Sequence, residues 1–82
     1  MTDREALIDF VRSELRSMKP RLPTGWTTSA HYSDDLDLDS LDLVELVARI
    51  EQRYGLLIPD EDLPSLVSLD ATADYLMARV PK

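Results

Sequence analysis

The sequence predicts a small all-α bundle of three main helices plus one short helix, with a long loop between the first two main helices. Three stretches repeat apolar residues at intervals of three and four, as amphipathic helices do. No stretch alternates apolar and polar residues for long enough to form a strand. The two glycines and one phenylalanine also argue against a sheet-rich fold. With 82 residues there is no room for a second core, so residues 1–82 are expected to form one domain.

The first helix is expected to end near residue 18. Thr2 and Glu5 fit a capping box, with Thr2 as the N-cap. Apolar residues then recur at helical spacing: Leu7, Phe10, Val11, Leu15 and Met18. Pro20 and Pro23 stop the helix because proline cannot continue its hydrogen bonds.

Residues 19–38 have no helical period and contain proline, glycine, threonine and serine, which predicts a long ordered loop. A loop of this length is uncommon unless it is functional or anchored. Four side chains are expected to hold it to the core: Leu22, Trp26, Tyr32 and Leu36.

A second helix is expected from an N-cap at Asp39 or Ser40 to about Tyr54, closed by Gly55. One apolar line is the expected core face: Leu43, Leu46, Val47, Ile50 and Tyr54. A second apolar line, flanked by acids, is rotated by roughly 120–150°: Leu41, Val44 and Ala48. Either the long loop covers this second line or a partner binds it, and we favour the partner.

Two shorter helical elements follow. Residues 58–60 begin a short turn of helix that extends to about Leu66. Ser68 caps a last helix over residues 69–80, which Pro81 ends. Its inward residues are expected to be Leu69, Tyr75, Leu76 and Val80.

The net charge of −7 is concentrated in the middle of the chain. Ten acids and two bases lie between Asp34 and Asp62, whereas the remaining residues carry six acids and seven bases. Because a negative surface repels phosphates, we expect no binding to nucleic acid. A patch of one sign favours a basic protein partner, although a merely solvated acidic face would have the same composition.

The start of the chain is charged and helical, and no stretch approaches the ~20 apolar residues of a membrane-spanning helix. The absence of cysteine excludes a disulfide framework and thiolate chemistry. We therefore expect a cytoplasmic monomer that does not insert into membranes.

Ser40 stands among acids and leucines in the stretch DLDLDSLDLVEL, residues 35–46. A hydrolytic serine needs a base, and the only histidine is His31 in the expected loop, with no G-x-S-x-G turn around Ser40. Acids at exposed positions lack the burial that would raise one pKa for paired-carboxylate catalysis. The D-x-D-x-D run lacks the sixth-position glycine and the twelfth-position glutamate of a calcium loop. We expect neither a metal site nor catalysis.

A helix N-terminus at Ser40 would suit a phosphate, because its first amides lack partners and the positive end of the helix dipole lies there. One interpretation is a phosphodiester on Ser40, with the acidic helix left for a basic enzyme. The other is that Ser40 only caps the helix.

The run DSLDLVEL at residues 39–46 is followed by IPDED at residues 58–62. These two motifs, at this distance, resemble those of acyl carrier proteins. The first and last expected helices are consistent with that family, so the resemblance covers most of the chain.

The resemblance implies that a phosphopantetheinyl transferase, using coenzyme A and magnesium, attaches 4′-phosphopantetheine to Ser40, with Asp39 and Leu41 beside it. The thiol of this arm would carry acyl groups as thioesters to acyl-loading enzymes, ketosynthases, reductases or transferases. The implied partner surface comprises Asp42, Val44, Glu45, Ala48, Asp60 and Glu61. Candidates for an acyl cavity, which ordinary core packing explains equally well, are Leu46, Ile50, Leu66, Ala73 and Leu76.

Three features depart from the family pattern. Asp37 stands where the family commonly has glycine, Arg49 adds a positive charge to the second helix, and the loop carries Trp26 and two prolines. The G-G-x-S pattern of peptidyl carriers is absent. We interpret these features as favouring a dedicated polyketide, lipid or lipopeptide pathway over general fatty-acid synthesis. The acyl group is not specified.

Two functions of other classes compete with a carrier. An unmodified acidic helical adaptor would dock a basic protein while Ser40 only caps its helix. A small hydrolase would show turnover that depends on His31.

Overall fold

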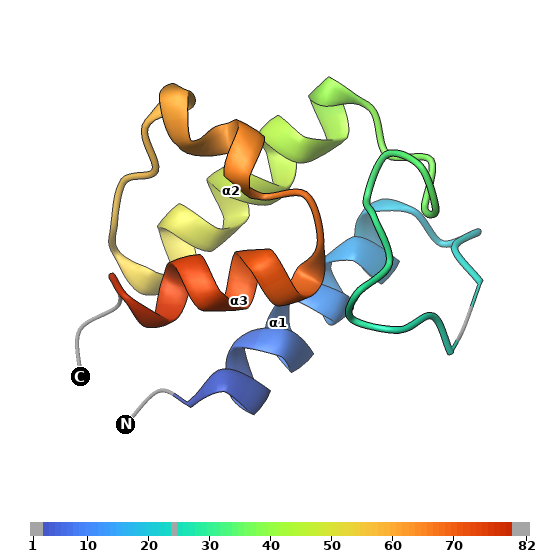
Figure 1. The fold of residues 1–82 in the computed structure, drawn as a ribbon, viewed down its shortest axis with the longest axis horizontal. Coiled ribbons are helices and arrows are strands. Elements are labelled where there is room, and N and C mark those ends of the chain that lie inside the picture. The colour runs from blue at the N-terminus through green and yellow to red at the C-terminus, as the bar shows by residue number, and fades with distance from the viewer. Residues whose placement is uncertain (1–2, 24, 80–82) are drawn as a thin grey trace.

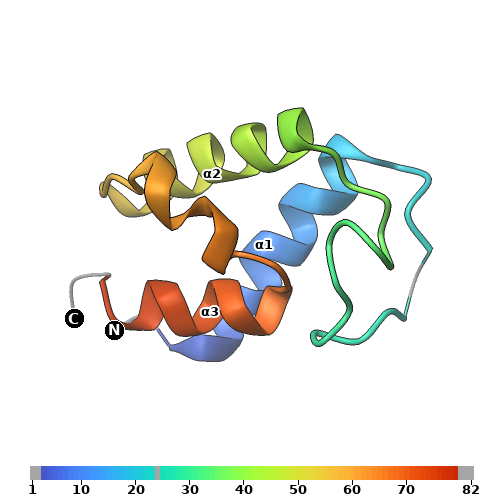
Figure 2. The same ribbon diagram turned by 45° about the horizontal axis from the view of Figure 1, so that its top comes forward.

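The computed structural model describes residues 3–23 and 25–79 (Figure 1). Its elements are α1 (Arg4–Met18), α2 (Ser40–Tyr54), the 3₁₀ helix η1 (Asp60–Ser65) and α3 (Leu69–Met77). α1 packs against both α2 and α3, and η1 packs against α3. Figures 1 and 2 show α1 crossing behind α3, with the long loop bulging from one end of the bundle. Within the described residues there is no strand, and the predicted all-α bundle is confirmed.

The N-cap of α1 is Asp3, whose side chain accepts a hydrogen bond from the Ala6 amide at 2.7 Å. Because Asp3 is the N-cap, the predicted capping box was wrong by one position. The predicted N-cap, Thr2, itself lies outside the described residues. Aspartate caps a helix as well as threonine does, so the sequence alone offered two adjacent candidates. The predicted end of this helix at Met18 is confirmed.

Both ends of α2 agree with the sequence. Asp39 is the N-cap, so of the two predicted candidates Ser40 becomes the first helical residue. Gly55 ends the helix at φ 66°, a left-handed conformation that glycine adopts without a steric cost, and its amide donates to the Glu51 carbonyl.

α3 is shorter than predicted. Ser68 caps it as expected, accepting from the Ala71 amide at 3.1 Å, but the helix ends at Met77 rather than near residue 80. The Arg79 amide donates to the Leu76 carbonyl at 2.9 Å, which tightens the chain into a turn after the helix. Val80, predicted to face inward, lies outside the described residues.

The core is built from the predicted inner faces of the helices together with the loop. Leu46, Val47 and Ile50 of α2 are buried, and Leu43 and Tyr54 are partly buried against them. The other fully buried leucines and valine come from the remaining helices and from the segment before α3: Leu7, Val11, Leu15, Leu66, Leu69 and Leu76.

The long loop is anchored where the sequence predicted. Tyr32 and Leu36 are buried, and Leu22 and Trp26 are partly buried. Leu38, which the sequence analysis did not include, is buried as well.

Polar contacts fix the same loop to the helices. The Tyr32 hydroxyl donates to Thr72 Oγ1 at 2.8 Å, and Thr72 Oγ1 donates in turn to the Ser68 carbonyl. Arg12 donates to the Trp26 carbonyl at 3.0 Å and lies 4.4 Å from the centre of its ring. The segment that leads into α2 is therefore held in one place.

Candidate functional site

Ser40 is the exposed first residue of α2. The Asp39 side chain accepts from the Asp42 amide at 2.8 Å, and the Asp42 side chain accepts from the Asp39 amide at 3.1 Å, completing a capping box. The amides of Ser40 and Leu41 have no acceptor inside the helix, because no carbonyl lies four residues before them in it. The serine hydroxyl therefore stands beside two free backbone donors at the positive end of the helix dipole.

A pocket of about 270 Å³ opens beside Ser40. Apolar and aromatic side chains from the loop, α2, η1 and the segment before α3 make most of its wall, and polar residues of the loop and of the start of α2 complete it. Its lining residues are His31, Tyr32, Ser33, Leu38, Asp39, Ser40, Leu43, Leu63, Pro64, Leu66 and Val67. A chain attached to Ser40 could therefore enter an apolar hollow without rearranging α2.

The outer face of α2 carries the second apolar line. Leu41 is 77% exposed, Val44 is 53% exposed, and Ala48 is exposed. The described part of the loop does not cover them. Of the two predicted alternatives, cover by the long loop therefore disagrees with the structure, and a surface open to a partner agrees with it. A contiguous apolar strip on an exposed helix face is typical of a contact surface.

The acids beside this strip are already in ion pairs. Lys19 Nζ, at the end of α1, lies 2.9 Å from Asp42 Oδ2. Arg49 lies 3.0 Å from Glu45 on α2 and 3.5 Å from Glu14 on α1. The hydrogen bond from Lys19 is the main reason that the pKa of Asp42 is lowered, and the same bond raises the pKa of Lys19.

The acids of η1 differ from those of α2. Asp60 and Glu61 are exposed, and no ion pair among the described residues includes them. Asp62 instead accepts a hydrogen bond from the Tyr75 hydroxyl at 2.6 Å and lies 3.8 Å from Arg79. Through these contacts with α3 and with the turn that follows it, η1 holds its part of the pocket wall in place.

Comparison with known proteins assigns the family. The family described as "Phosphopantetheine attachment site" matches residues 7–76. A mitochondrial acyl carrier protein of Neurospora crassa is 40% identical over 57 residues, covering 70% of this chain and 42% of that protein. Mitochondrial acyl carrier protein 2 of Arabidopsis thaliana is 34% identical over 74 residues, covering 90% of this chain and 59% of that protein. The chain belongs to the acyl carrier protein family.

An acyl carrier protein of Rubrobacter xylanophilus is also 39% identical over 51 residues, covering 62% of this chain and 63% of that protein. The matched part thus spans between 42 and 63% of the length of these relatives. Members of this family are carriers rather than enzymes, and their cofactor is covalently attached 4′-phosphopantetheine.

The geometry around Ser40 fits this cofactor. A phosphodiester needs an exposed hydroxyl, and Ser40 provides one. The free amides of Ser40 and Leu41 can donate to phosphate oxygens. The apolar pocket next to Ser40 can take part of the arm or its cargo. When attached, the cofactor supplies a thiol, which this cysteine-free chain lacks.

The five acyl-cavity candidates are all buried in the core: Leu46, Ile50, Leu66, Ala73 and Leu76. Of these, only Leu66 also lines the pocket beside Ser40. The other apolar lining residues were not predicted as part of a cavity: Leu38, Leu43, Leu63, Pro64 and Val67. For Leu38 a signal existed, because it alternates with acids immediately before Ser40, but the remaining residues meet only through the tertiary fold.

Ser40 has no hydrogen-bonded base among the described residues. His31 and Ser40 line the same pocket, yet no hydrogen bond among the described residues joins them. The His31 amide donates to Asp35 at 2.7 Å, and its ring nitrogen Nδ1 accepts from the Asp34 amide at 3.4 Å. The described residues also contain no group of three or more acids or histidines placed to hold a metal ion.

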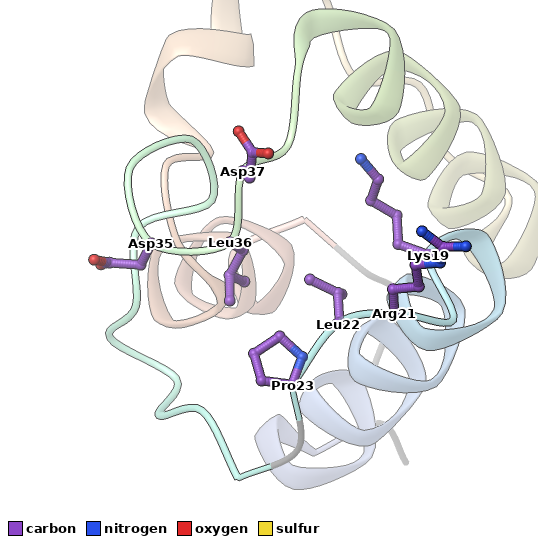
Figure 3. A pocket seen from close by; sticks show the side chains of 7 residues that line it. All are labelled: Lys19, Arg21, Leu22, Pro23, Asp35, Leu36 and Asp37. Carbon is purple, nitrogen blue, oxygen red and sulfur yellow. The ribbon is translucent and has the colours of Figure 1, made fainter.

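A second hollow, of about 260 Å³, lies between the end of α1 and the loop (Figure 3). In Figure 3 Lys19 extends toward the first turn of α2, and Leu22 and Leu36 point into the hollow. Asp37, at its rim, has φ 57°. Glycine adopts this left-handed conformation most readily, and aspartate is among the few other residues that tolerate it.

None of the helices in the described residues is long and apolar enough to span a bilayer.

Proposed function

We propose that this protein carries acyl groups as thioesters on a 4′-phosphopantetheine arm attached to Ser40. The observation that supports it best is the exposed Ser40 hydroxyl, set between two free amides and an apolar pocket. Asp39 positions this serine as the N-cap of α2, and the free amide of Leu41 would donate to the phosphate of the arm. The family match over residues 7–76 supports the same function, and we propose one carrier domain over residues 1–82.

We further propose that partner enzymes bind the outer face of α2 together with η1. The apolar contact would come from Leu41, Val44 and Ala48, and the charged rim from Asp42, Glu45, Asp60 and Glu61. An exposed apolar centre with a charged rim has the composition of a transient docking surface. The partners would be a phosphopantetheinyl transferase and enzymes that load, extend, reduce or transfer acyl groups.

For the pathway, we propose dedicated polyketide, lipid or lipopeptide synthesis over general fatty-acid synthesis. The names of the three relatives specify no pathway. Arg49 supports the proposal, since its ion pair with Glu45 changes the charge of the face that partners read. Acyl transfer from the loaded carrier to ketosynthases of both pathway types would test it, and preference for the fatty-acid enzyme would contradict it.

We propose a monomer located in the cytoplasm. Two relatives carry mitochondrial names, so a mitochondrial location is the competing possibility. Fractionation of the source cells, with detection of the untagged protein, would distinguish the two locations, and sedimentation would test the monomer.

The test of the carrier function is the intact mass before and after incubation with coenzyme A, magnesium and a broad-specificity phosphopantetheinyl transferase. A gain of one phosphopantetheine is expected in the wild type and no gain in Ser40→Ala. Ser33→Ala is the matched control, because Ser33 lines the same pocket and should leave the gain intact.

Because Asp39 supplies the cap, Ser40→Ala is expected to change the free energy of unfolding by less than ~0.5 kcal/mol. No mass gain by a folded wild type that carries no earlier modification would contradict the carrier and favour the unmodified adaptor.

A further inference from the structure

We infer that Lys19 and Arg49 determine which partners dock on the outer face of α2. Each of them holds one acid of this face in an ion pair within the chain. A basic partner residue therefore has to displace one of these side chains before it can use that acid. The inference rests on the proposed carrier function, because it concerns the surface that the carrier's enzymes would bind.

The first ion pair occupies the start of the face. Lys19 Nζ lies 2.9 Å from Asp42 Oδ2, and the same carboxylate oxygen accepts a hydrogen bond from the Asp39 amide at 3.1 Å. Asp42 thus has two donors on one oxygen and only 22% of its side chain exposed. A basic side chain of a partner would therefore meet a carboxylate whose negative charge already has a partner in Lys19 and whose Oδ2 already has two donors.

The second ion pair lies one turn further along α2. Arg49 follows Glu45 by four residues, a spacing at which helical side chains meet, and the two are 3.0 Å apart. Glu14 on α1 holds the same guanidinium from the other side at 3.5 Å. Because Arg49 is anchored from two helices, Glu45 keeps its partner although 56% of the glutamate side chain is exposed.

The acids of η1 provide the contrast within the same surface. Asp60 and Glu61 are exposed and take part in no ion pair found among the described residues. The partner that fits best therefore contacts Leu41 and Val44 with apolar side chains and places its basic residues opposite η1. A partner whose basic residues lie only over the middle of α2 would bind more weakly, because the acids there are already held in ion pairs. Unfavourable contacts of this kind create specificity as much as attractive ones do.

The test measures kcat/KM for transfer of phosphopantetheine to the chain by a broad-specificity phosphopantetheinyl transferase, which serves as the basic partner. Arg49→Gln and Lys19→Gln are each expected to raise kcat/KM by about two- to fivefold at low salt, the range of an exposed ion pair. The gain should disappear at about 0.3 M salt, where exposed charges are screened. Glu14→Gln is the matched control: it keeps the ion pair between Arg49 and Glu45 and should not raise the rate.

A double-mutant cycle separates competition from a simple change in net charge. If Arg49 competes for Glu45, then Arg49→Gln should give less gain in the Glu45→Gln background than in the wild type. An equal gain in both backgrounds would overturn the inference, as would no gain from Arg49→Gln and Lys19→Gln in proteins whose melting curves remain normal. If Arg49→Gln does not fold, Lys19→Gln alone decides the outcome.

The rate at which the wild type accepts phosphopantetheine distinguishes failure of this inference from failure of the proposed carrier function. A wild type that accepts no phosphopantetheine would refute the carrier function, and the inference with it. A wild type that is modified at the same rate as both glutamine variants would refute only the role of Lys19 and Arg49.

Discussion

The two faces of α2 are both apolar but meet different surroundings. On the inner face Leu46 and Ile50 are at most 1% exposed, whereas on the outer face Leu41 is 77% and Val44 is 53% exposed. α1 packs against the helix, and the described part of the long loop leaves the outer strip open. An apolar line on a helix therefore predicts a contact, while only the neighbouring elements decide whether that contact lies inside the molecule or with a partner.

The largest expected effect comes from breaking the inner face. Ile50→Ala should lower the free energy of unfolding by about 2–5 kcal/mol, because it leaves a cavity in a fully buried position. Val44→Ala should change it by less than ~0.5 kcal/mol. Urea denaturation would measure both. A similar loss in the two variants would mean that the outer face is packed, whereas slower phosphopantetheine transfer to Val44→Ala alone would support its role in docking.

The next effect concerns the interior, where the hydroxyls of Tyr32 and Thr72 form a buried hydrogen bond. Thr72→Val should cost about 1–3 kcal/mol, because the buried Tyr32 hydroxyl then has no acceptor. Tyr32→Phe should cost only about 1 kcal/mol, since Thr72 Oγ1 still donates to the Ser68 carbonyl. Thermal unfolding of both variants checks the order, and a larger loss in Tyr32→Phe would contradict it.

A smaller effect concerns Asp37 and Gly55, two residues near the ends of α2 whose backbone has a left-handed conformation. Gly55→Ala should lower the free energy of unfolding by about 1 kcal/mol, because alanine is strained at φ 66° although its Cβ would meet no atom within 4 Å. Asp37→Gly should change it by less than ~0.5 kcal/mol, since relief at φ 57° is offset by a freer unfolded chain. Urea midpoints of the two variants test the difference.

The smallest effect probes the charges on the outer face through pH. The Lys19 ammonium lowers the pKa of Asp42, so the folded state holds this aspartate as an anion more strongly than the unfolded state does. The resulting stability is present above the ordinary aspartate pKa of about 4 and is lost as pH falls through the lowered value. Melting temperatures between pH 7 and pH 3 should therefore fall slightly less in Lys19→Gln than in the wild type. Parallel curves would mean that the ion pair contributes nothing to stability.

Local signals predicted most element boundaries. The stop at Gly55, the cap at Ser68 and one of the two predicted caps of α2, Asp39, are confirmed, because each depends on hydrogen bonds between residues a few positions apart. The errors lie where adjacent residues compete for one role, as at the start of α1, or where a helix tightens at its end, as after Met77. Short-range chemistry cannot rank such alternatives when their energies are similar.

The sequence by itself determined the helical fold, the motif around Ser40 and the existence of two apolar lines on α2. Spacing and capping carry this information, since they act within one or two helical turns. Only the tertiary structure decided which line is exposed, which residues line the pocket beside Ser40, and that Lys19 and Arg49 occupy the acids of the outer face. These features join residues far apart in the sequence, such as Glu14 and Arg49 at 35 positions, and arise from packing between elements rather than from any local pattern.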